Sequence, residues 1–215
     1  FKQKTAYEIG SGLVGSEMSI RDRASTAMEA GFSTRVLDMQ ALDLQNGRFF
    51  DPAGELVNRC FKLYPWEWMV DESPDGCLAE MEWLEPIWKL VMSNKAILAT
   101  LYELFPDSPY VLPCYLSRPR SGLFCKKPIF SREGHNVSVV DIRDWEEYVR
   151  IAETEGDYNT GAYVYQEYVE PTAYSGRYPV IGSWIIGGEA AGIGIRENRM
   201  EVTDNLSEFV PHIIG

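Results

Sequence analysis

Apolar residues recur at helical spacing in two stretches that lie far apart in the chain. In the first, SIRDRASTAMEAGF (19–32), Ser19 can cap the start of a helix and Gly31 its end. Its apolar face consists of Ile20, Ala24, Ala27 and Met28. The second begins after Ser93 or Asn94 and ends at Pro106, and its apolar face consists of Ile97, Leu98, Leu101, Leu104 and Phe105. We therefore expect a helix in each stretch.

Other segments show the alternation and the turn residues that are typical of strands. STRVLDM (33–39) predicts a strand, and a region rich in Gly, Asp and Pro predicts turns over 46–54. RDWEEYVRIAETE (143–155) predicts an amphipathic helix. Further strands are predicted at 122–130, 136–142, 162–170, 178–186 and 189–197, with an SREGH turn after the first and a Gly187-Gly188 hairpin before the last. The expected fold class is α+β, with mostly antiparallel sheets and packed helices.

The charge and the cysteines narrow the function classes. A net charge of −12 argues against general nucleic-acid binding, so an anionic ligand would need a local group of cations. No apolar run is long enough to span a bilayer and residues 1–20 lack the layout of a signal peptide, so we expect a cytoplasmic protein with no membrane partner. The four cysteines (Cys60, Cys77, Cys114 and Cys125) form no C-x-x-C pair, which predicts reduced thiols and no zinc site.

Lys95 stands at the start of the second predicted helix. A cation there opposes the helix dipole at a typical cost of about 0.3–1 kcal/mol. A bound anion would remove that cost, because the free N–H groups of the helix and the lysine would attract it together. From the spacing alone, an exposed lysine tolerated at slight cost is the simpler interpretation.

A second group of cations lies in CKKPIFSREGHN (125–136). Because strand residues alternate between faces, Lys127 and Ile129 share one side and Lys126 points to the other. In the turn that follows, Gly134 would let the backbone approach a phosphate closely. A solvated turn with scattered charges fits this pattern equally well.

Two weaker signals come later in the chain. In VYQEYVE (164–170), backbone groups with apolar neighbours could bind an adenine edge, although most such segments are plain strands. Arg196 ends a glycine-rich strand and could stabilise a transferring phosphoryl group, although a lone arginine there is usually a surface residue.

A competing signal is GSGLVG (10–15), which fits the G-x-G-x-x-G motif of dinucleotide-binding folds, with Asp38 after the next predicted strand. The segment before it is a poor buried parallel strand, and the rest of the chain is expected to be antiparallel. A dinucleotide-dependent oxidoreductase is therefore a distant alternative.

Several long motifs follow one another in a recognisable order. They are FKLYPWEWM (61–69), EPIWKLVMSNKAIL (85–98), KKPIFSREGHNV (126–137), YQEYV (165–169), VIGSWIIGGEAAGIGIRE (180–197) and VTDNLSEFVPH (202–212). Their order and spacing resemble the C-terminal synthetase domain of the glutathionylspermidine synthase family, from about Ser19 to the end of the chain.

The resemblance implies an ATP-grasp-like fold with a nucleotide cleft. Members of the family are ATP-dependent carbon–nitrogen ligases that activate a carboxylate as an acyl phosphate, which an amine then attacks. The implied cofactors are ATP and Mg²⁺, and the implied partners are a small carboxylate, such as a glutathione-like peptide, and an amine such as a polyamine. We divide the chain into a substrate-side part, 1–92, and an ATP-grasp nucleotide-binding part, 93–215.

The resemblance also implies roles for single residues. Lys95 and Lys127 would hold ATP phosphates, and Arg196 would stabilise the transition state of phosphoryl transfer. The phosphate-covering loop would contain Arg132, Gly134 and Asn136, and the adenine-binding hinge would be Gln166, Glu167, Tyr168 and Val169. In EVT (201–203), Val202 and Thr203 would lie near the nucleotide, and Tyr64, Trp66 and Glu67 would line the acid-substrate pocket.

Two features depart from the family pattern. The family's Mg²⁺ ligands lie in Arg-Phe-Asp and Glu-Tyr-Asn motifs upstream of the matched region, and neither motif occurs here, so no metal ligand is assigned and impaired activity is expected. Residues 1–16 match poorly, as in a truncated or rearranged end. The chain shows no trace of a cysteine–histidine amidase domain, so no hydrolytic activity is expected.

The main alternative function is a catalytically inactive ATP-binding or interaction module. The sequence leaves the oligomeric state and the identity of both substrates open.

Overall fold

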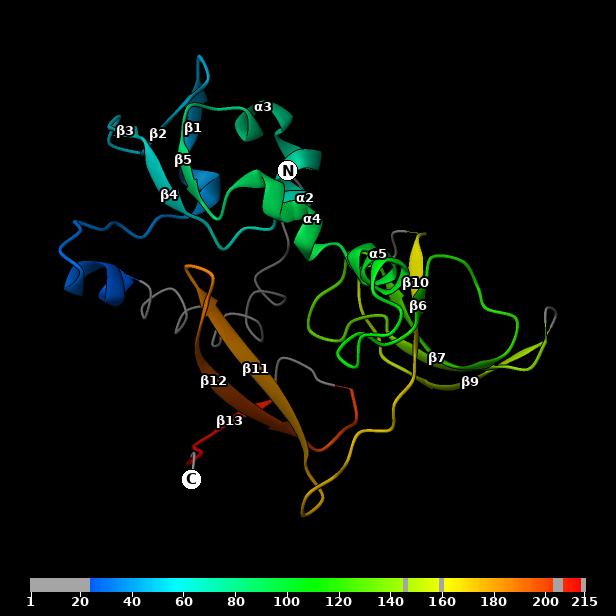
Figure 1. Ribbon diagram of the computed structural model, residues 1–215. Coiled ribbons are helices and arrows are strands. Elements are labelled where there is room, and N and C mark those ends of the chain that lie inside the picture. The colour runs from blue at the N-terminus through cyan, green and yellow to red at the C-terminus, as the bar shows by residue number, and fades with distance from the viewer. Residues whose placement is uncertain (1–23, 145–146, 159–160, 203–206, 214–215) are drawn as a thin grey trace. The chain divides into compact units, whose positions relative to one another are not determined.

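The computed structural model describes residues 24–144, 147–158, 161–202 and 207–213 (Figure 1). The chain forms two compact units, Phe1–Met92 and Ser93–Gly215. This division falls where the sequence analysis divides the chain. The roles assigned to the two parts stay predictions.

The first unit combines short strands with short helices. Residues 24–29 are helical and end in Gly31 at φ +88°, where Gly31 N donates to Met28 O and Phe32 N to Ala27 O. This confirms the predicted end of that helix, whereas its predicted cap Ser19 lies outside the described residues.

The strands of the first unit are β1 (Asp43–Gln45), β2 (Arg48–Phe50) and β3 (Leu56–Val57), which are antiparallel, and β4 (Arg59–Phe61) and β5 (Glu82–Leu84), which are parallel. The helices are η1 (Met39–Ala41), α2 (Trp66–Glu72), α3 (Pro74–Cys77), η2 (Ile87–Lys89) and α4 (Leu90–Ser93).

Aromatic rings form the core of this unit. Phe49 of β2 and Trp66 of α2 each meet the ring of Trp83 on β5 edge to face, with centroid distances of 5.7 and 5.3 Å. Met69 lies in the same buried cluster. Edge-to-face pairs add about 0.5–1.5 kcal/mol to the gain from burial, so they fix α2 against the strands.

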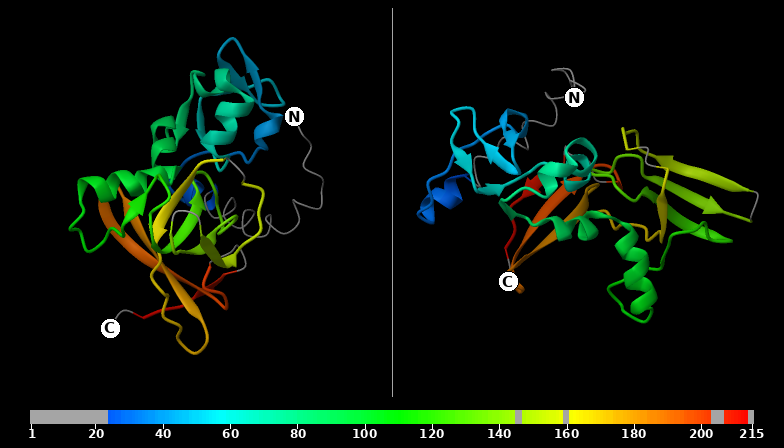
Figure 2. Two further views of the ribbon diagram at one scale, coloured as in Figure 1. Left: turned by 90° about the vertical axis from the view of Figure 1, so that its right-hand side faces the viewer. Right: turned by 90° about the horizontal axis from the view of Figure 1, so that it is seen from above.

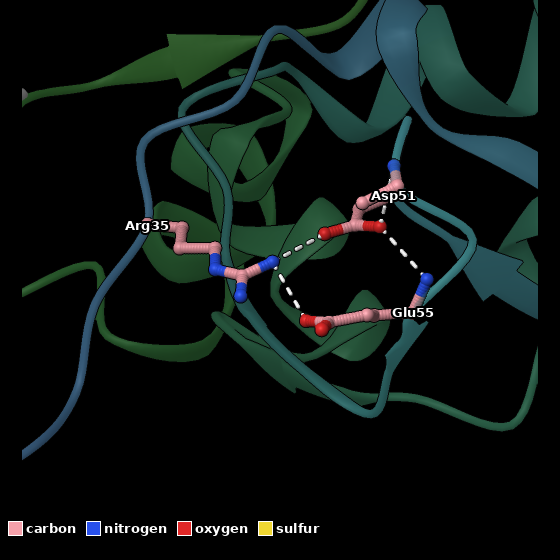
Figure 3. Close-up of polar contacts among 4 residues, drawn as sticks. Arg35, Asp51 and Glu55 are labelled. Atoms are coloured by element: carbon pink, nitrogen blue, oxygen red, sulfur yellow. Dashed lines mark hydrogen bonds and ion pairs between the residues drawn. The ribbon is translucent and has the colours of Figure 1, made fainter.

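A buried carboxylate organises the turn between β2 and β3 (Figure 3). Asp51 Oδ1 accepts the backbone N–H groups of Ala53 and Glu55, at 2.9 and 2.8 Å. Its other oxygen lies 2.6 Å from the guanidinium of Arg35, which also pairs with the Glu55 carboxylate at 2.7 Å. These hydrogen bonds, with that from Glu55 N first, lower the pKa of Asp51 below its ordinary value against the opposing effect of burial.

The second unit is built on a five-stranded antiparallel sheet with the order β6-β10-β7-β8-β9. The strands are β6 (Cys114–Tyr115), β7 (Gly122–Pro128), β8 (Ser138–Ile142), β9 (Tyr148–Glu153) and β10 (Tyr163–Glu167). Helix α5 (Ala96–Leu104) packs Ala99 against Cys114 and Val164 on one face of this sheet. The predicted helix before Pro106 and the predicted strands in 122–130, 136–142 and 162–170 are confirmed.

A second antiparallel sheet completes this unit. Its strands are β11 (Tyr178–Ile186), β12 (Glu189–Asn198) and β13 (Glu208–Val210), in that order. Strands β11 and β12 form a long hairpin through Gly187 and Gly188, both at positive φ, as predicted (orange in Figures 1 and 2).

Two predicted elements are wrong. The segment 33–39 contains no strand: residues 33–38 have no regular secondary structure and η1 begins at Met39. The Val36 side chain is 60% exposed, so no burial of this residue favours its pairing in a sheet. The helix predicted over 143–155 is instead strand β9, which pairs with β8. Backbone bonds from Arg143 and Asp144 to Glu147 O turn the chain back, so that Val149 and Ile151 lie in an edge strand, which suits β-branched residues.

The described residues thus form a mixed structure with mostly antiparallel sheets and few helices, in agreement with the expected α+β class. The glycine motif of 10–15 lies outside the part of the chain that the structure describes. Within that part, no helix combines the length and the apolar character that crossing a membrane requires. All four cysteines are free thiols, and only Cys114 is fully buried.

Candidate nucleotide site

Lys127 and Gln166 meet on neighbouring strands of the second unit. β7 and β10 pair with Lys127 opposite Val164 and Cys125 opposite Gln166, which places all four side chains on one face. On that face, Lys127 Nζ donates to Gln166 Oε1 at 2.7 Å. Lys126 lies on the other face, where its ammonium is 4.0 Å from the centre of the Tyr163 ring. The predicted separation of the two lysines is confirmed.

Lys95 is bound to the continuation of the same strand. It stands at the N-cap of α5, and its backbone N–H donates to Ile129 O at 2.8 Å. Its ammonium donates to the hydroxyl of Ser131 at 2.9 Å and to the Ser131 carbonyl at 2.5 Å. Lys127 thus lies on β7 and Lys95 is bonded to the residues that follow this strand, although 31 residues, including all of α5, lie between the two lysines in the sequence.

The loop after Ser131 is tightly turned. Glu133, Gly134 and Asn136 all have positive φ, of 54°, 73° and 55°. Glycine adopts this conformation without cost, whereas the two other residues need support from their surroundings. Arg132 is exposed, and Asn136 Oδ1 accepts the backbone N–H of Tyr158 at 2.8 Å. The three residues predicted for the phosphate-covering loop thus lie together in one turn.

The predicted hinge, Gln166 to Val169, begins with the last two residues of β10 and continues beyond its end. The backbone N–H of Glu167 donates to Pro113 O at 2.8 Å and that of Tyr168 to Leu123 O at 3.0 Å. The Tyr168 hydroxyl donates to Glu201 Oε2 at 2.8 Å, while Val169 is 59% exposed. Burial, together with the Glu201 carboxylate, raises the pKa of Tyr168 to about 12.

The hydrogen bond between Tyr168 and Glu201 brings the segment 201–202 to the hinge. In this segment the predicted residue Val202 accepts a hydrogen bond at its carbonyl oxygen from the Asn198 side chain, at 3.2 Å. Thr203 lies outside the described residues.

Arg196 lies in the middle of the second sheet. It pairs with Val180 of β11 on one side and with Phe209 of β13 on the other, and its guanidinium carbon is 5.9 Å from the Phe209 ring centre. In the part of the chain that the structure describes, no hydrogen bond or ion pair joins Arg196 to Lys95, Lys127 or the hinge. Its catalytic role stays a prediction.

The three residues predicted for acid-substrate binding belong to the first unit. Trp66 is a core residue: it is 5% exposed and its indole N–H donates to Glu85 O at 3.1 Å. Tyr64 donates its hydroxyl to Glu72, and burial followed by this bond raises the pKa of Tyr64. Glu67 lies in the first turn of α2. These contacts explain how α2 is held and leave substrate binding untested.

A resident metal site is not apparent in this set of residues. Within the described ranges, no three His, Cys, Asp or Glu side chains gather closely enough to hold a metal ion.

Two residues that hold the candidate site in place, Ser131 and Thr154, were not predicted from the sequence. Ser131 and Thr154 contact Lys95 and Gly134 across 36 and 20 positions, and neither is part of a recognisable motif. Only the pairing of β7, β8 and β9 brings them near the predicted residues.

Comparisons with known proteins identify the family of this chain. The family model described as glutathionylspermidine synthase preATP-grasp matches residues 16–215, and the chain belongs to this family. The resemblance seen in the sequence is thereby confirmed at the level of the family.

Curated relatives carry the names of ligases. A putative acid–amine ligase of Haemophilus influenzae is 35% identical over 198 residues, 88% of this chain and 50% of that protein. A trypanothione synthetase of Crithidia fasciculata is 36% identical, over 59% of this chain and 19% of that protein. A bifunctional glutathionylspermidine synthetase/amidase of Escherichia coli is 28% identical, over 86% of this chain and 34% of that protein. The chain thus spans half or less of the length of these relatives.

Proposed function

We propose that this chain is an ATP-dependent amide ligase, or the nucleotide-binding part of one. The observation that carries the proposal is the placement of two lysines: Lys127 lies on β7 and contacts Gln166 of the predicted hinge, and Lys95 is bonded to Ser131 just beyond the end of β7. In a chain of net charge −12, such a local pair of cations is what an anionic nucleotide requires. Membership of a family whose relatives are named as a ligase and as synthetases supports the same conclusion.

The proposed binding mode follows from the contacts. Lys127 touches Gln166, so a nucleotide with its base at the hinge would place the phosphates nearest its ribose at Lys127. Lys95 and the turn with Arg132, Gly134 and Asn136 would hold the outer phosphates, and Val202 and Thr203 would border the nucleotide. Since the N–H groups of Glu167 and Tyr168 already have backbone partners, the adenine edge would be bound by other main-chain groups of the hinge.

The proposed reaction has two steps. A carboxylate oxygen of the acid substrate attacks the γ-phosphorus of ATP, ADP leaves, and an acyl phosphate forms. The amine then attacks the acyl carbon, inorganic phosphate leaves, and the nitrogen loses a proton to give the amide. Arg196 would stabilise the charge of the phosphoryl group in transfer. Tyr64, Trp66 and Glu67 stay candidates for recognising the acid, with a glutathione-like peptide and a polyamine as first substrates to test.

Mg²⁺ belongs to the proposal only as the ion that accompanies ATP and neutralises its phosphates. No step above is assigned to a metal ligand of the chain. The absence of the Arg-Phe-Asp and Glu-Tyr-Asn motifs from this sequence is what favours the second candidate, a catalytically inactive ATP-binding or interaction module.

Phosphate release separates the two candidates. The chain is incubated with Mg-ATP, a glutathione-like peptide and spermidine, and phosphate and amide are measured together. Phosphate release that needs both acid and amine, with equal amide formed, supports the ligase. ATP binding without phosphate release under any substrate pair supports the inactive module.

A further inference from the structure

The turn proposed to cover the phosphates is fixed at its far end by one side chain. Thr154 directly follows β9, and its hydroxyl donates to Gly134 O and accepts the backbone N–H of Val137 at 2.9 Å. Its own backbone N–H donates to Val137 O at 2.9 Å. Thr154 thus binds the two residues that flank His135 and Asn136, namely Gly134 and Val137.

The residues after Thr154 continue the contact. Tyr158 N donates to Asn136 Oδ1, and Asn136 N donates to Glu155 O at 3.4 Å. Between them, Gly156 lies against His135 so closely that a Cβ on Gly156 would be 2.4 Å from His135 Cβ and 2.8 Å from Asn136 Oδ1. Only a glycine allows this approach, because the backbone fixes the position of His135 Cβ and a hydrogen bond from Tyr158 N holds Asn136 Oδ1.

The near end of the turn is fixed by Lys95, whose ammonium is bonded to Ser131. Between the two fixed ends, Glu133 and Asn136 adopt left-handed conformations that are unfavourable without outside support. The bonds from Thr154 and the fit of Gly156 supply that support. The conformation of the turn therefore depends on a segment, 154–158, that carries no candidate ligand-binding side chain.

We propose that Thr154 is a positioning residue for triphosphate recognition, which it serves by holding the turn 131–137 in its bound shape. This inference rests on the proposed function, since it takes the phosphates of ATP as the ligand of that turn. Thr154 acts through Gly134, Asn136 and Arg132 and does not itself contact the nucleotide. Gly156 belongs to the same support.

The test compares Thr154→Val, which keeps the shape and removes the hydroxyl, with Thr154→Ser, which keeps the hydroxyl. Affinity for a non-hydrolysable ATP analogue is measured by calorimetry in the full chain. We expect Thr154→Val to bind about tenfold more weakly, as the loss of two hydrogen bonds would predict, and Thr154→Ser to bind nearly as the natural chain does. Thr172→Val, at an exposed threonine, is the matched control and is expected to change nothing.

A second arm shows whether Thr154 acts through the turn. In an Arg132→Ala background, Thr154→Val should cost much less than tenfold, because the contact that it positions is already gone. An equal loss in both backgrounds, an unchanged affinity, or a Thr154→Ser variant as weak as Thr154→Val would overturn the inference. If Thr154→Val does not fold, Thr154→Ala, which also lacks the hydroxyl, takes its place and is subject to the same outcomes. Absence of ATP binding by the natural chain would instead overturn the proposed function, and the inference with it.

Discussion

At the scale of single residues, Lys127 is the clearest candidate for a contact with the nucleotide. Its ammonium is held 2.7 Å from Gln166 on the face of β7 opposite to Lys126. Lys127→Ala should weaken the binding of an ATP analogue by about 1–3 kcal/mol in calorimetric titration, the usual cost of losing a charge-assisted hydrogen bond. Lys126→Ala is the matched control, since it removes the same charge from the other face. Equal affinities of the natural chain and the Lys127 variant would remove Lys127 from the site.

Arg196 is predicted to act on the rate and not on binding. If its charge meets the phosphoryl group only in the transition state, Arg196→Ala should retain nearly full affinity for ATP and lose measurable turnover. Binding is followed by calorimetry and turnover by phosphate release. Arg177→Ala, which breaks an ion pair with Glu208 near the same sheet, should leave both quantities unchanged. A parallel loss of affinity and rate would give Arg196 a ground-state role.

Asp51 should make the stability of the first unit depend on pH. Its pKa is lower in the folded chain than its ordinary value of 3.8. The stabilisation is therefore present above pH 3.8 and is lost as the pH falls through the lower, folded pKa. We expect Asp51→Asn to lower the thermal midpoint at pH 7, as followed by circular dichroism, and the difference from the natural chain to shrink below pH 3.8. Asp107→Asn, at an exposed carboxylate, should leave the midpoint at pH 7 unchanged, and a midpoint for Asp51→Asn that stays unchanged at pH 7 would contradict the assignment.

The candidate site was predictable from the sequence only where a residue's type carries the signal. Lys95 before an apolar helical face and Lys127 on an alternating strand could both be singled out from their neighbours. Thr154 could not, because it is an ordinary residue in a segment whose apparent period predicts a helix. The burial of Trp66 was equally hidden, since an aromatic-rich motif fits a substrate pocket and a core alike.

At the scale of elements, α5 matters because Lys95 directly precedes it. Asn94 Oδ1 accepts the N–H of Ala96 at 2.9 Å and so caps the start of the helix. Asn94→Ala should lower the free energy of unfolding of the second unit by about 1 kcal/mol, whereas Asn94→Asp, which keeps the acceptor, should restore most of it. Urea unfolding measures both. Equal stabilities of all three chains would show that the cap contributes nothing.

The elements predicted correctly are those with local signals at both ends. Gly187-Gly188 marks the β11–β12 hairpin, and Pro106 marks the end of α5. The error over 143–155 has a different origin, because the pairing of β9 with β8 is a tertiary contact that overrides helical spacing. The error over 33–39 is the reverse case: strand-forming residues are present, but no strand lies beside them.

At the scale of the whole molecule, the question is whether ATP binding depends on a metal ion. A ligand that binds only the folded chain raises its stability, by about 2.7 kcal/mol at a hundredfold excess over the dissociation constant. We therefore expect a non-hydrolysable ATP analogue to raise the thermal midpoint of unfolding, and adenosine at the same concentration to raise it much less, because the two lysines attract the phosphates.

Addition of Mg²⁺ then distinguishes the two candidate functions at the level of the intact chain. In the proposed ligase Mg²⁺ lies between the phosphates, so we expect the stabilisation by the ATP analogue to be larger by several degrees with Mg²⁺ than with a chelator. An equal stabilisation with Mg²⁺ and with a chelator would contradict this expectation. It would mean that the lysines alone neutralise the phosphates, which suits a nucleotide-binding module.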